Sequence, residues 1–294
     1  MAIILGLTGA ICWGVADFIA RFASQRIGAY RTTLFAQWFG FSVLSAYLMW
    51  SGGISRGVAP GWQPWALAAL AGLINAAGSL ALYHSFQIGT MSIVAPVSSS
   101  YPALTIILAL LSGEHIGSVR GMGLLVTFVG VILAATSFSP DANHASSGNG
   151  RTSKAHLSKG VGWAIFAAAS FGFQFWYLGY FVVPLVGAAV SVWVIRLSTF
   201  TSLALVAAPA RQSIRLPRGA VWWMLAAVGL IDTSAFVANN AGLHTGQISV
   251  VTVLTSLYGA VTVLLAWIFL REKVERSQWF GIVLVFAGII LVSL

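Results

Sequence analysis

Long hydrophobic runs recur along nearly the whole chain and are separated by short polar segments. A helix that crosses a bilayer needs roughly 20 mainly apolar residues. Runs of about this length predict ten membrane spans at residues 2–23, 31–50, 63–87, 92–112, 119–138, 160–182, 188–208, 219–242, 248–270 and 277–294.

The longest polar segment, residues 139–159, divides this pattern near its middle. It is rich in Ser, Gly, Asn and His, which is typical of a flexible connector, and it leaves five predicted helices on each side. The pattern therefore predicts two units, 1–138 and 160–294, joined by a polar connector.

The composition indicates that lipid is the outer solvent. Hydrophobic residues make up 59% of the chain and charged residues only 7%, whereas a soluble domain carries roughly 25% charged residues. The net charge of +9 would suit a nucleic-acid binder, but the basic residues stand in short loops between apolar runs, which is a pattern of membrane topology. We expect an all-α membrane protein whose partner is the lipid bilayer and not nucleic acid.

The two halves of the sequence resemble one another. A shift of 157 residues, or of 158 after a one-residue gap, brings scarce residue types into register. The matched pairs include Trp65–Trp222, Asn75–Asp232, Ser99–Ser256, Tyr101–Tyr258, Thr105–Thr262 and Glu114–Glu272. Because each unit has an odd number of predicted helices, the second copy enters the membrane upside down. Two inverted five-helix repeats place a binding site between the copies near the midplane, so this arrangement predicts a transporter with a central cavity.

The basic residues predict the orientation. Twelve of the 15 follow the first, fifth, seventh and ninth spans, and only Arg56 and Arg120 lie on the opposite side. Since cytoplasmic loops retain Lys and Arg, both termini are predicted to lie outside the cytoplasm.

Four acidic residues stand near the ends or the middle of predicted spans. Asp17 precedes Arg21 by four residues, so we expect a local ion pair on one helix face. Glu114 and Glu272 each end an apolar run, and we expect both in solvated turns. Asp232 lies in mid-span and is a candidate for function, because charged groups inside a membrane are costly.

Asp232 and its repeat mate Asn75 allow two interpretations. They either hydrogen-bond across the bundle or face a water-filled cavity. Arg196 lies inside a span, opposite Gln37 if the repeats are aligned. It needs a carboxylate or carbonyl partner or must extend to the membrane interface, and we expect a structural pairing.

Hydroxyl and amide clusters mark four spans, at 83–84, 98–101, 239–240 and 255–258. Such groups either join helices or line a cavity, and we favour the cavity. Pro96 and Pro102 free backbone carbonyls at this depth, which is tolerated only where the backbone is buried or lines a cavity.

The sequence lacks the motifs of several kinds of chemistry. The sequence has no phosphate-binding loop for ATP, no HExxH or Cys/His cluster for a metal, and no Ser in a GxSxG pattern. We expect no cofactor, no metal and no enzyme activity.

Two dipeptides and one longer pattern resemble a known family. Trp13-Gly14 and Phe171-Gly172 lie in the first and sixth spans, and a Glu-x8-Gly-x6-Gly pattern ends each half. These features resemble the EamA-type repeat of the drug/metabolite transporter superfamily over nearly the whole chain except the connector. Within the family the likeness is greatest to exporters of aromatic amino acids. It implies alternating access and outward movement of amino acids across the inner membrane of a bacterium. The basic-residue pattern places both termini in the periplasm. Two fused inverted copies can close a complete cavity, so we expect a functional monomer.

The resemblance also implies which residues bind the substrate. They are Trp13, Asn75, Tyr83, His84, Ser99, Tyr101, Phe171, Gln174, Asp232, Asn239 and Tyr258. One position departs from the family pattern, because many such repeats have an Arg in the second helix and this chain has Gln37 there. A symmetric Arg pair is therefore not expected.

Other functions remain possible at this point. Other small metabolites or drugs fit the same architecture. A nucleotide-sugar or phosphorylated-metabolite carrier would need several cavity Lys or Arg residues, and Arg196 alone is a poor match. A lipid-modifying enzyme would need convergent acid, base or metal ligands, and a receptor or structural protein gives no reason for an inverted repeat.

Overall fold

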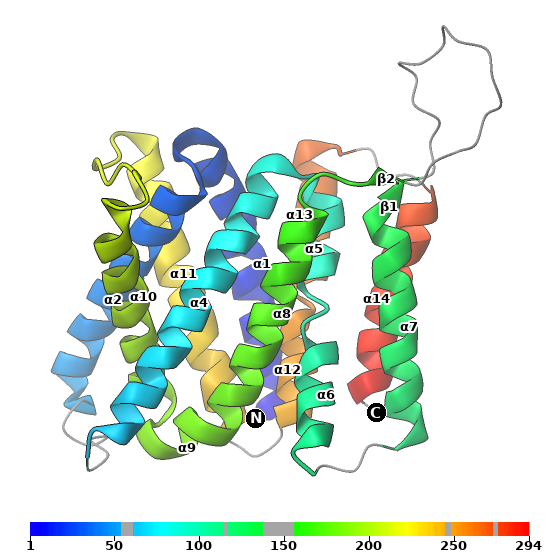
Figure 1. Ribbon diagram of the computed structural model, residues 1–294, viewed down its shortest axis with the longest axis horizontal. Helices are drawn as coiled ribbons and strands as arrows, with labels where there is room; N and C mark the ends of the chain where they lie inside the picture. The colour runs from blue at the N-terminus through cyan, green and yellow to red at the C-terminus, as the bar shows by residue number, and fades with distance from the viewer. Residues whose placement is uncertain (54–60, 114–116, 138–155, 245–247, 273–275, 294) are drawn as a thin grey trace, which may run out of the picture.

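The computed structural model describes the chain except residues 54–60, 114–116, 138–155, 245–247, 273–275 and 294. Its helices stand side by side between two opposite faces (Figure 1). Seven of them run unbroken through the described residues: α1 (Ala2–Ile27), α2 (Ala29–Ser51), α4 (Gln63–Ile88), α7 (Ser118–Ala135), α10 (Ala188–Ala207), α11 (Ala220–Leu243) and α14 (Arg276–Ser293).

Three further helical segments contain a break or an irregular turn. The fourth predicted span is divided into α5 (Met91–Ser98) and α6 (Pro102–Leu111). The sixth consists of α8 (Val161–Tyr177), the π-helical turn η1 (Leu178–Val182) and α9 (Val183–Val186). The ninth consists of α12 (Ile248–Ser256), α13 (Tyr258–Leu265) and the π-helical turn η2 (Ala266–Leu270). About ten helical segments therefore correspond to the ten predicted spans.

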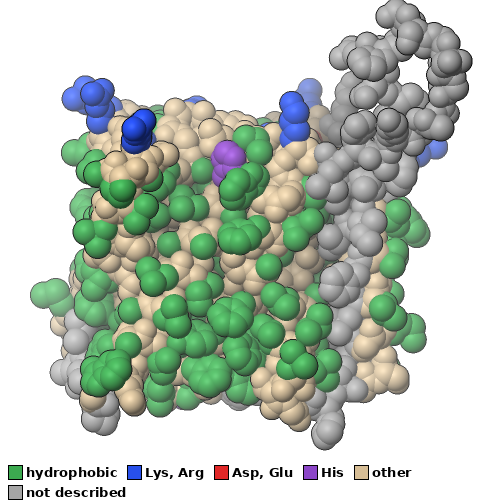
Figure 2. Space-filling model, viewed as in Figure 1, with side chains coloured by type: hydrophobic (Ala, Val, Ile, Leu, Met, Phe, Trp, Pro, Cys, Tyr) green, Lys and Arg blue, Asp and Glu red, His purple; other side chains and the backbone are tan. Residues whose placement is uncertain are grey.

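The outer surface of the bundle is apolar. Six described helices are long and apolar enough to cross a membrane: Ile3–Ile27, Gln63–Ile88, Met91–Leu111, Val161–Val186, Ala188–Ala207 and Ala220–Leu243. Large side chains such as Leu125, Trp223 and Phe269 are 67–75% exposed, and hydrophobic groups cover the middle of the face in Figure 2. A surface of this kind is stable in lipid, so the predicted all-α membrane protein is confirmed.

The broken fourth span is explained by its prolines. Pro96 lies inside α5, and Pro102 begins α6. Proline has no backbone N–H and its ring clashes with the preceding turn. The repeat mate of this break, between Ser256 and Tyr258, has no proline. Both breaks lie beside the matched tyrosines Tyr101 and Tyr258, so the second half has the same interruption with a different local sequence.

The two halves start on opposite faces. Both chain ends lie on one face in Figure 1, whereas α8 begins at the other face, beside β1 (Thr136–Ser137) and β2 (His156–Leu157). These short strands pair antiparallel. The visible Lys and Arg side chains gather on the face opposite the termini (Figure 2). Most of the predicted connector 139–159 lies outside the described residues.

The glycines that end each repeat join α7 to α14. A Cβ atom built on Gly130 would lie 2.9 Å from the Gly281 carbonyl oxygen, and one on Gly288 would lie 2.8 Å from the Gly123 carbonyl oxygen. Only glycine allows two backbones to approach so closely. The Glu-x8-Gly-x6-Gly pattern therefore forms the contact between the last helices of the two halves.

The surroundings of Glu272 differ from the solvated turn predicted from the sequence. Its carboxylate accepts hydrogen bonds from the Met91 and Ser92 backbone N–H groups at 3.2 and 2.8 Å and from the Ser92 hydroxyl at 2.8 Å. It also pairs with Arg21 at 3.0 Å. The predicted solvated turn is wrong for Glu272, because the carboxylate caps the N-terminus of α5, where unpaired N–H groups favour an anion. Glu114 lies outside the described residues.

Candidate functional site

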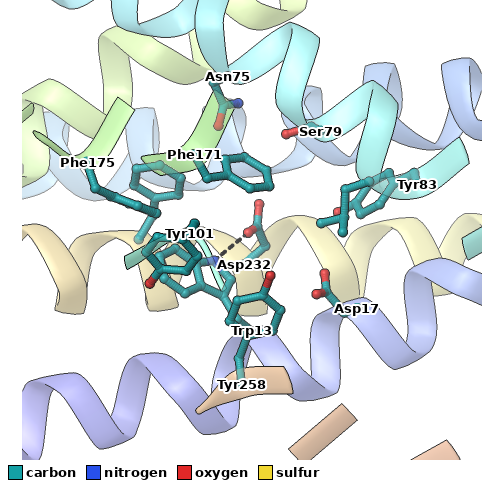
Figure 3. A pocket seen from close by; sticks show the side chains of 12 residues that line it. Trp13, Asp17, Asn75, Ser79, Tyr83, Tyr101, Phe171, Phe175, Asp232 and Tyr258 are labelled. Carbon is teal, nitrogen blue, oxygen red and sulfur yellow. Dashed lines mark hydrogen bonds between the residues drawn. The ribbon is translucent and has the colours of Figure 1, made fainter. Parts of the chain in front are cut away.

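A small cavity of about 40 Å³ lies between the two halves. Figure 3 shows its lining, which comes from α1, α4, the α5–α6 junction, α8, α11 and α13. The lining residues are Trp13, Asp17, Asn75, Ser79, Leu82, Tyr83, Tyr101, Phe171, Phe175, Asp232, Phe236 and Tyr258.

Aromatic rings form most of the wall. The Trp13 ring lies 5.4 Å from Phe236, 5.6 Å from Phe175 and 6.2 Å from Tyr258, measured between centroids. Tyr101 and Tyr258 are stacked with centroids 6.4 Å apart and planes 17° apart. Rings at these separations attract one another beyond simple area burial. The two broken spans therefore meet at the cavity through a pair of matched tyrosines.

An ionic network supports one side of the wall. The Arg196 guanidinium pairs with the Asp232 carboxylate at 2.7 Å and donates to the Gln37 side-chain oxygen at 2.7 Å. Trp13 Nε1 donates to the other Asp232 oxygen at 2.8 Å. The guanidinium also lies over the Phe236 ring, 5.1 Å from its centroid. The expected partner of Arg196 is confirmed, and the Asp232 charge is neutralised where it faces the cavity.

Asn75 is held by a separate set of neutral groups. Its amide nitrogen donates to the Thr199 hydroxyl at 3.2 Å, and its oxygen accepts from the Gln174 amide at 3.4 Å. Asn75 and Asp232 both line the cavity and are fixed by different partners. Both residues therefore bond to side chains of other helices and also line the cavity, so both features that the sequence presented as alternatives are present.

The predicted ion pair of Asp17 with Arg21 is also absent from the structure. Arg21 pairs with Glu272 and donates to the Gly89 carbonyl at 3.2 Å, so the predicted local pair of Asp17 with Arg21 is wrong. Asp17 is 5% exposed and faces the cavity. Among the described residues, its carboxylate has neither a hydrogen-bond donor nor an ion-pair partner.

The structure brings seven of the eleven predicted site residues to the cavity lining. These are Trp13, Asn75, Tyr83, Tyr101, Phe171, Asp232 and Tyr258. Whether they contact a substrate stays a prediction.

The other four predicted residues are not part of the lining of this cavity. His84 packs its ring edge-on against Trp163, with centroids 5.1 Å apart. Ser99 donates to the Pro96 carbonyl of its own helix at 3.0 Å. Gln174 supports Asn75 from behind, and Asn239 accepts from the Thr255 hydroxyl at 3.1 Å. The last two join helices and do not face the open space.

The residues that sequence reasoning missed share one simple signal. Asp17, Ser79, Phe175 and Phe236 each lie four residues after a predicted lining residue. Residues at i and i+4 lie on one helix face, so extending each prediction by one turn finds all four. Leu82 is the fifth missed residue.

The lining has no set of metal ligands. Among the described residues there is no group of three or more His, Cys, Asp or Glu side chains that would hold a metal ion. Within the same described residues the lining contains two carboxylates and no Lys, Arg or His. The arrangement suits noncovalent binding of a partly aromatic small molecule.

Comparison with known proteins identifies the family. A model of the EamA-like transporter family matches residues 1–136 and again residues 158–294. The chain therefore belongs to the EamA-like transporter family, carries its repeat twice, and is a transporter and not an enzyme.

The individual similar proteins support the fold but do not identify a substrate. The uncharacterized protein MJ1333.1 of Methanocaldococcus jannaschii is 44% identical over 52 residues, which are 18% of this chain and 38% of that protein. The match thus spans less than half of that relative's length. A solved crystal structure is similar to this chain with a TM-score of 0.65 and 16% sequence identity, covering 99% of this chain and 95% of the other. This likeness shows a shared fold.

Proposed function

We propose that this member of the EamA-like transporter family exports amino acids, with a preference for aromatic ones, by alternating access. The observation that carries the proposal is the cavity lining, in which seven of twelve side chains are aromatic. Rings that offer their faces to the open space can stack on a substrate ring, which contributes roughly 0.5–1.5 kcal/mol per pair beyond area burial.

The arrangement of the two halves supports alternating access. The second half starts on the face opposite the first (Figure 1), as expected for two inverted five-helix repeats around a central cavity. Broken helical segments contribute Tyr101 and Tyr258 to the lining. In transporters with inverted repeats, the site lies between the repeats and is formed by discontinuous helices. The rocking of one repeat against the other would expose the cavity to each side in turn.

The cellular setting is proposed from the topology prediction and from the family resemblance. With the basic face in the cytoplasm, both termini lie in the periplasm and the protein resides in the inner membrane of a bacterium. Two fused inverted repeats can enclose a complete cavity within one chain. We therefore propose a functional monomer that carries amino acids from the cytoplasm outward.

Phosphorylated cargo fits the cavity poorly. A nucleotide sugar would need cationic side chains against its phosphates, and the described lining supplies two carboxylates and no Lys or Arg. Other aromatic metabolites or drugs remain the second candidate, because stacking on rings does not require the amino-acid backbone.

The direct test is transport by the purified protein in liposomes with labelled Phe, Trp and Thr, compared with liposomes lacking protein. We expect saturable uptake of Phe and Trp in preference to Thr. Tyr101→Ala and Tyr258→Ala should each reduce the Phe-over-Thr preference by roughly 2- to 12-fold, the equivalent of one lost ring contact.

Tyr47→Ala is the matched control, because Tyr47 is 52% exposed on the outside of α2. It should leave the preference unchanged. If none of the three amino acids moves saturably, the substrate assignment is wrong.

A further inference from the structure

We propose that Asp17 is the cation-binding group of the cavity, which binds the ammonium group of the substrate or a proton, but not both at once. This inference deepens the proposed function and rests on it for the identity of the substrate. Its chemistry, one carboxylate shared by two competing cations, is testable with any aromatic amine.

The first argument is the burial of an unpaired carboxylate. Asp17 is 5% exposed, lies in a membrane-spanning helix and faces the cavity (Figure 3). No hydrogen-bond donor or cation among the described residues contacts it. An ionised carboxylate in a buried place is costly unless it is paired. Asp17 therefore holds a proton when the cavity is empty, or a cationic ligand takes the place of a protein partner.

The second argument is the contrast with Asp232, the other carboxylate of the lining. Asp232 is neutralised by Arg196 at 2.7 Å and accepts from Trp13 at 2.8 Å. It has no need of a cationic ligand. Arg196 and Asp232 together contribute no net charge, so ionised Asp17 leaves the cavity with one excess negative charge.

The charged and titratable groups around Asp17 leave it free for a ligand. On α1 itself, Arg21 is one turn away but is held by Glu272. Asp232 of α11 repels the Asp17 charge. The groups that face Asp17 from the other packed helices are the neutral phenols Tyr83 of α4 and Tyr258 of α13, with Arg196 of α10 behind Asp232.

Two hydroxyls complete a site for an amino acid. Ser79 and Tyr83 lie one turn apart on α4 and line the cavity. Neither hydroxyl has a hydrogen-bond partner among the described residues. A substrate whose ammonium group donates to Asp17 can accept from these hydroxyls through its carboxylate, while its ring packs among the aromatic side chains. The site then distinguishes an amine from an acid of the same shape.

Competition at one carboxylate couples transport to protons. The loaded site carries the substrate one way, and the emptied site returns with a proton on Asp17. Each cycle moves one substrate out and one proton in, and no covalent bond to carbon changes. Exchange of a singly charged amine for a proton moves no net charge. Exchange of a zwitterionic amino acid for a proton moves one positive charge inward.

The test measures binding and proton release with the purified protein in a weakly buffered detergent solution containing a pH indicator. The probes are phenethylamine, which has a ring and an ammonium group, and 3-phenylpropionate, which has a ring and a carboxylate. We expect phenethylamine to bind and to release up to one proton per protein. Its affinity should rise roughly tenfold per pH unit until Asp17 is ionised, whereas 3-phenylpropionate should bind at least tenfold more weakly.

The variants are Asp17→Asn and Asp17→Glu, with Tyr47→Ala on the outside of α2 as the control. Asp17→Asn should abolish proton release and remove the pH dependence, and Asp17→Glu should retain both. Tyr47→Ala should also keep the pH dependence. If Asp17→Asn does not elute as a single species, retention of proton release by Asp17→Glu with a shifted midpoint decides the question.

Unchanged proton release in Asp17→Asn would overturn the inference and assign the proton to another group. The outcome is separable from the proposed function. Transport of Phe with the same pH dependence in Asp17→Asn keeps the function and rejects the role of Asp17. Proton release by phenethylamine without any transport of Phe keeps the role of Asp17 and rejects the amino-acid substrate.

Discussion

The two halves of the molecule approach the cavity through matching backbone contacts. In one contact, Gly14 of α1 lies against Tyr258 of α13, and in the other, Gly172 of α8 lies against Tyr101. A Cβ atom on Gly14 would lie 3.0 Å from the Tyr258 carbonyl oxygen, and one on Gly172 would lie 2.7 Å from the Tyr101 carbonyl oxygen. Both contacts join helices of opposite halves, and the partners are repeat mates.

The polar groups of the two halves differ at matched positions. The second half has the ion pair Arg196–Asp232, where the first half has Gln37 and Asn75. Where α8 has Phe175, α1 has Asp17, four residues after the matched pair Trp13 and Phe171.

This difference separates two requirements. The close helix contacts at Gly14 and Gly172 are present in both copies, because each half packs against the other in the same way. A single central site needs its charges only once, so the ionic groups are free to diverge between the copies. The residues that differ between the halves are therefore better guides to the substrate than the residues that match.

The largest effect is expected from breaking the ion pair of the second half. Asp232→Asn leaves the Arg196 guanidinium buried without a carboxylate and should destabilise the protein by about 3–5 kcal/mol. The measurement is reversible unfolding in SDS followed by tryptophan fluorescence.

The double variant Arg196→Gln/Asp232→Asn converts this site to the neutral chemistry of the first half. Replacing a whole buried ion pair is often nearly neutral, whereas removing one partner is not. We expect the double variant to recover most of the stability lost by Asp232→Asn. A double variant no more stable than the single one would mean that the ionic network, and not mere neutrality, holds the second half together.

The sequence was sufficient for the spans, the repeat and the broken fourth helix, because each depends on local composition or on matched scarce residues. It was also sufficient for most of the cavity wall. The helical period alone extends Trp13 to Asp17 and Asp232 to Phe236. These additional residues were available from spacing but were not inferred.

Choices of partner between distant helices were not predictable in this way. Arg21 has Asp17 one turn away, yet it pairs with Glu272 beyond η2, because the end of α1 lies close to that segment in space. The rotation of each helix about its axis also decides function. Ser99, Gln174 and Asn239 have suitable chemistry but face neighbouring helices, and hydropathy that is high on all sides of a helix does not specify its rotation.

The two glycine contacts should respond alike to an added methyl group. Gly14→Ala and Gly172→Ala each place a Cβ within 3.0 Å of a facing carbonyl oxygen, and overpacking of this kind costs about 1–3 kcal/mol. Gly162→Ala is the control on α8, since its added Cβ would meet no atom within 4 Å. Thermal stability in detergent, measured by size-exclusion recovery, compares the three. A large loss for only one of Gly14 and Gly172 would contradict the structural equivalence of these two helix contacts.

The smallest effect is expected from removing the threonine hydroxyl at each of these two helix contacts. Thr105 donates to the Gly172 carbonyl at 2.9 Å and to the Tyr101 carbonyl of its own helix at 3.4 Å. Its repeat mate Thr262 has the opposite balance, with 3.4 Å to the Gly14 carbonyl and 2.9 Å to Tyr258. Hydrogen bonds between membrane helices average about 0.6 kcal/mol. Thr105→Val should therefore cost about that much in SDS unfolding and Thr262→Val less, because only Thr105 has its shorter bond across the interface. Equal losses would mean that both hydroxyls join the halves to the same extent.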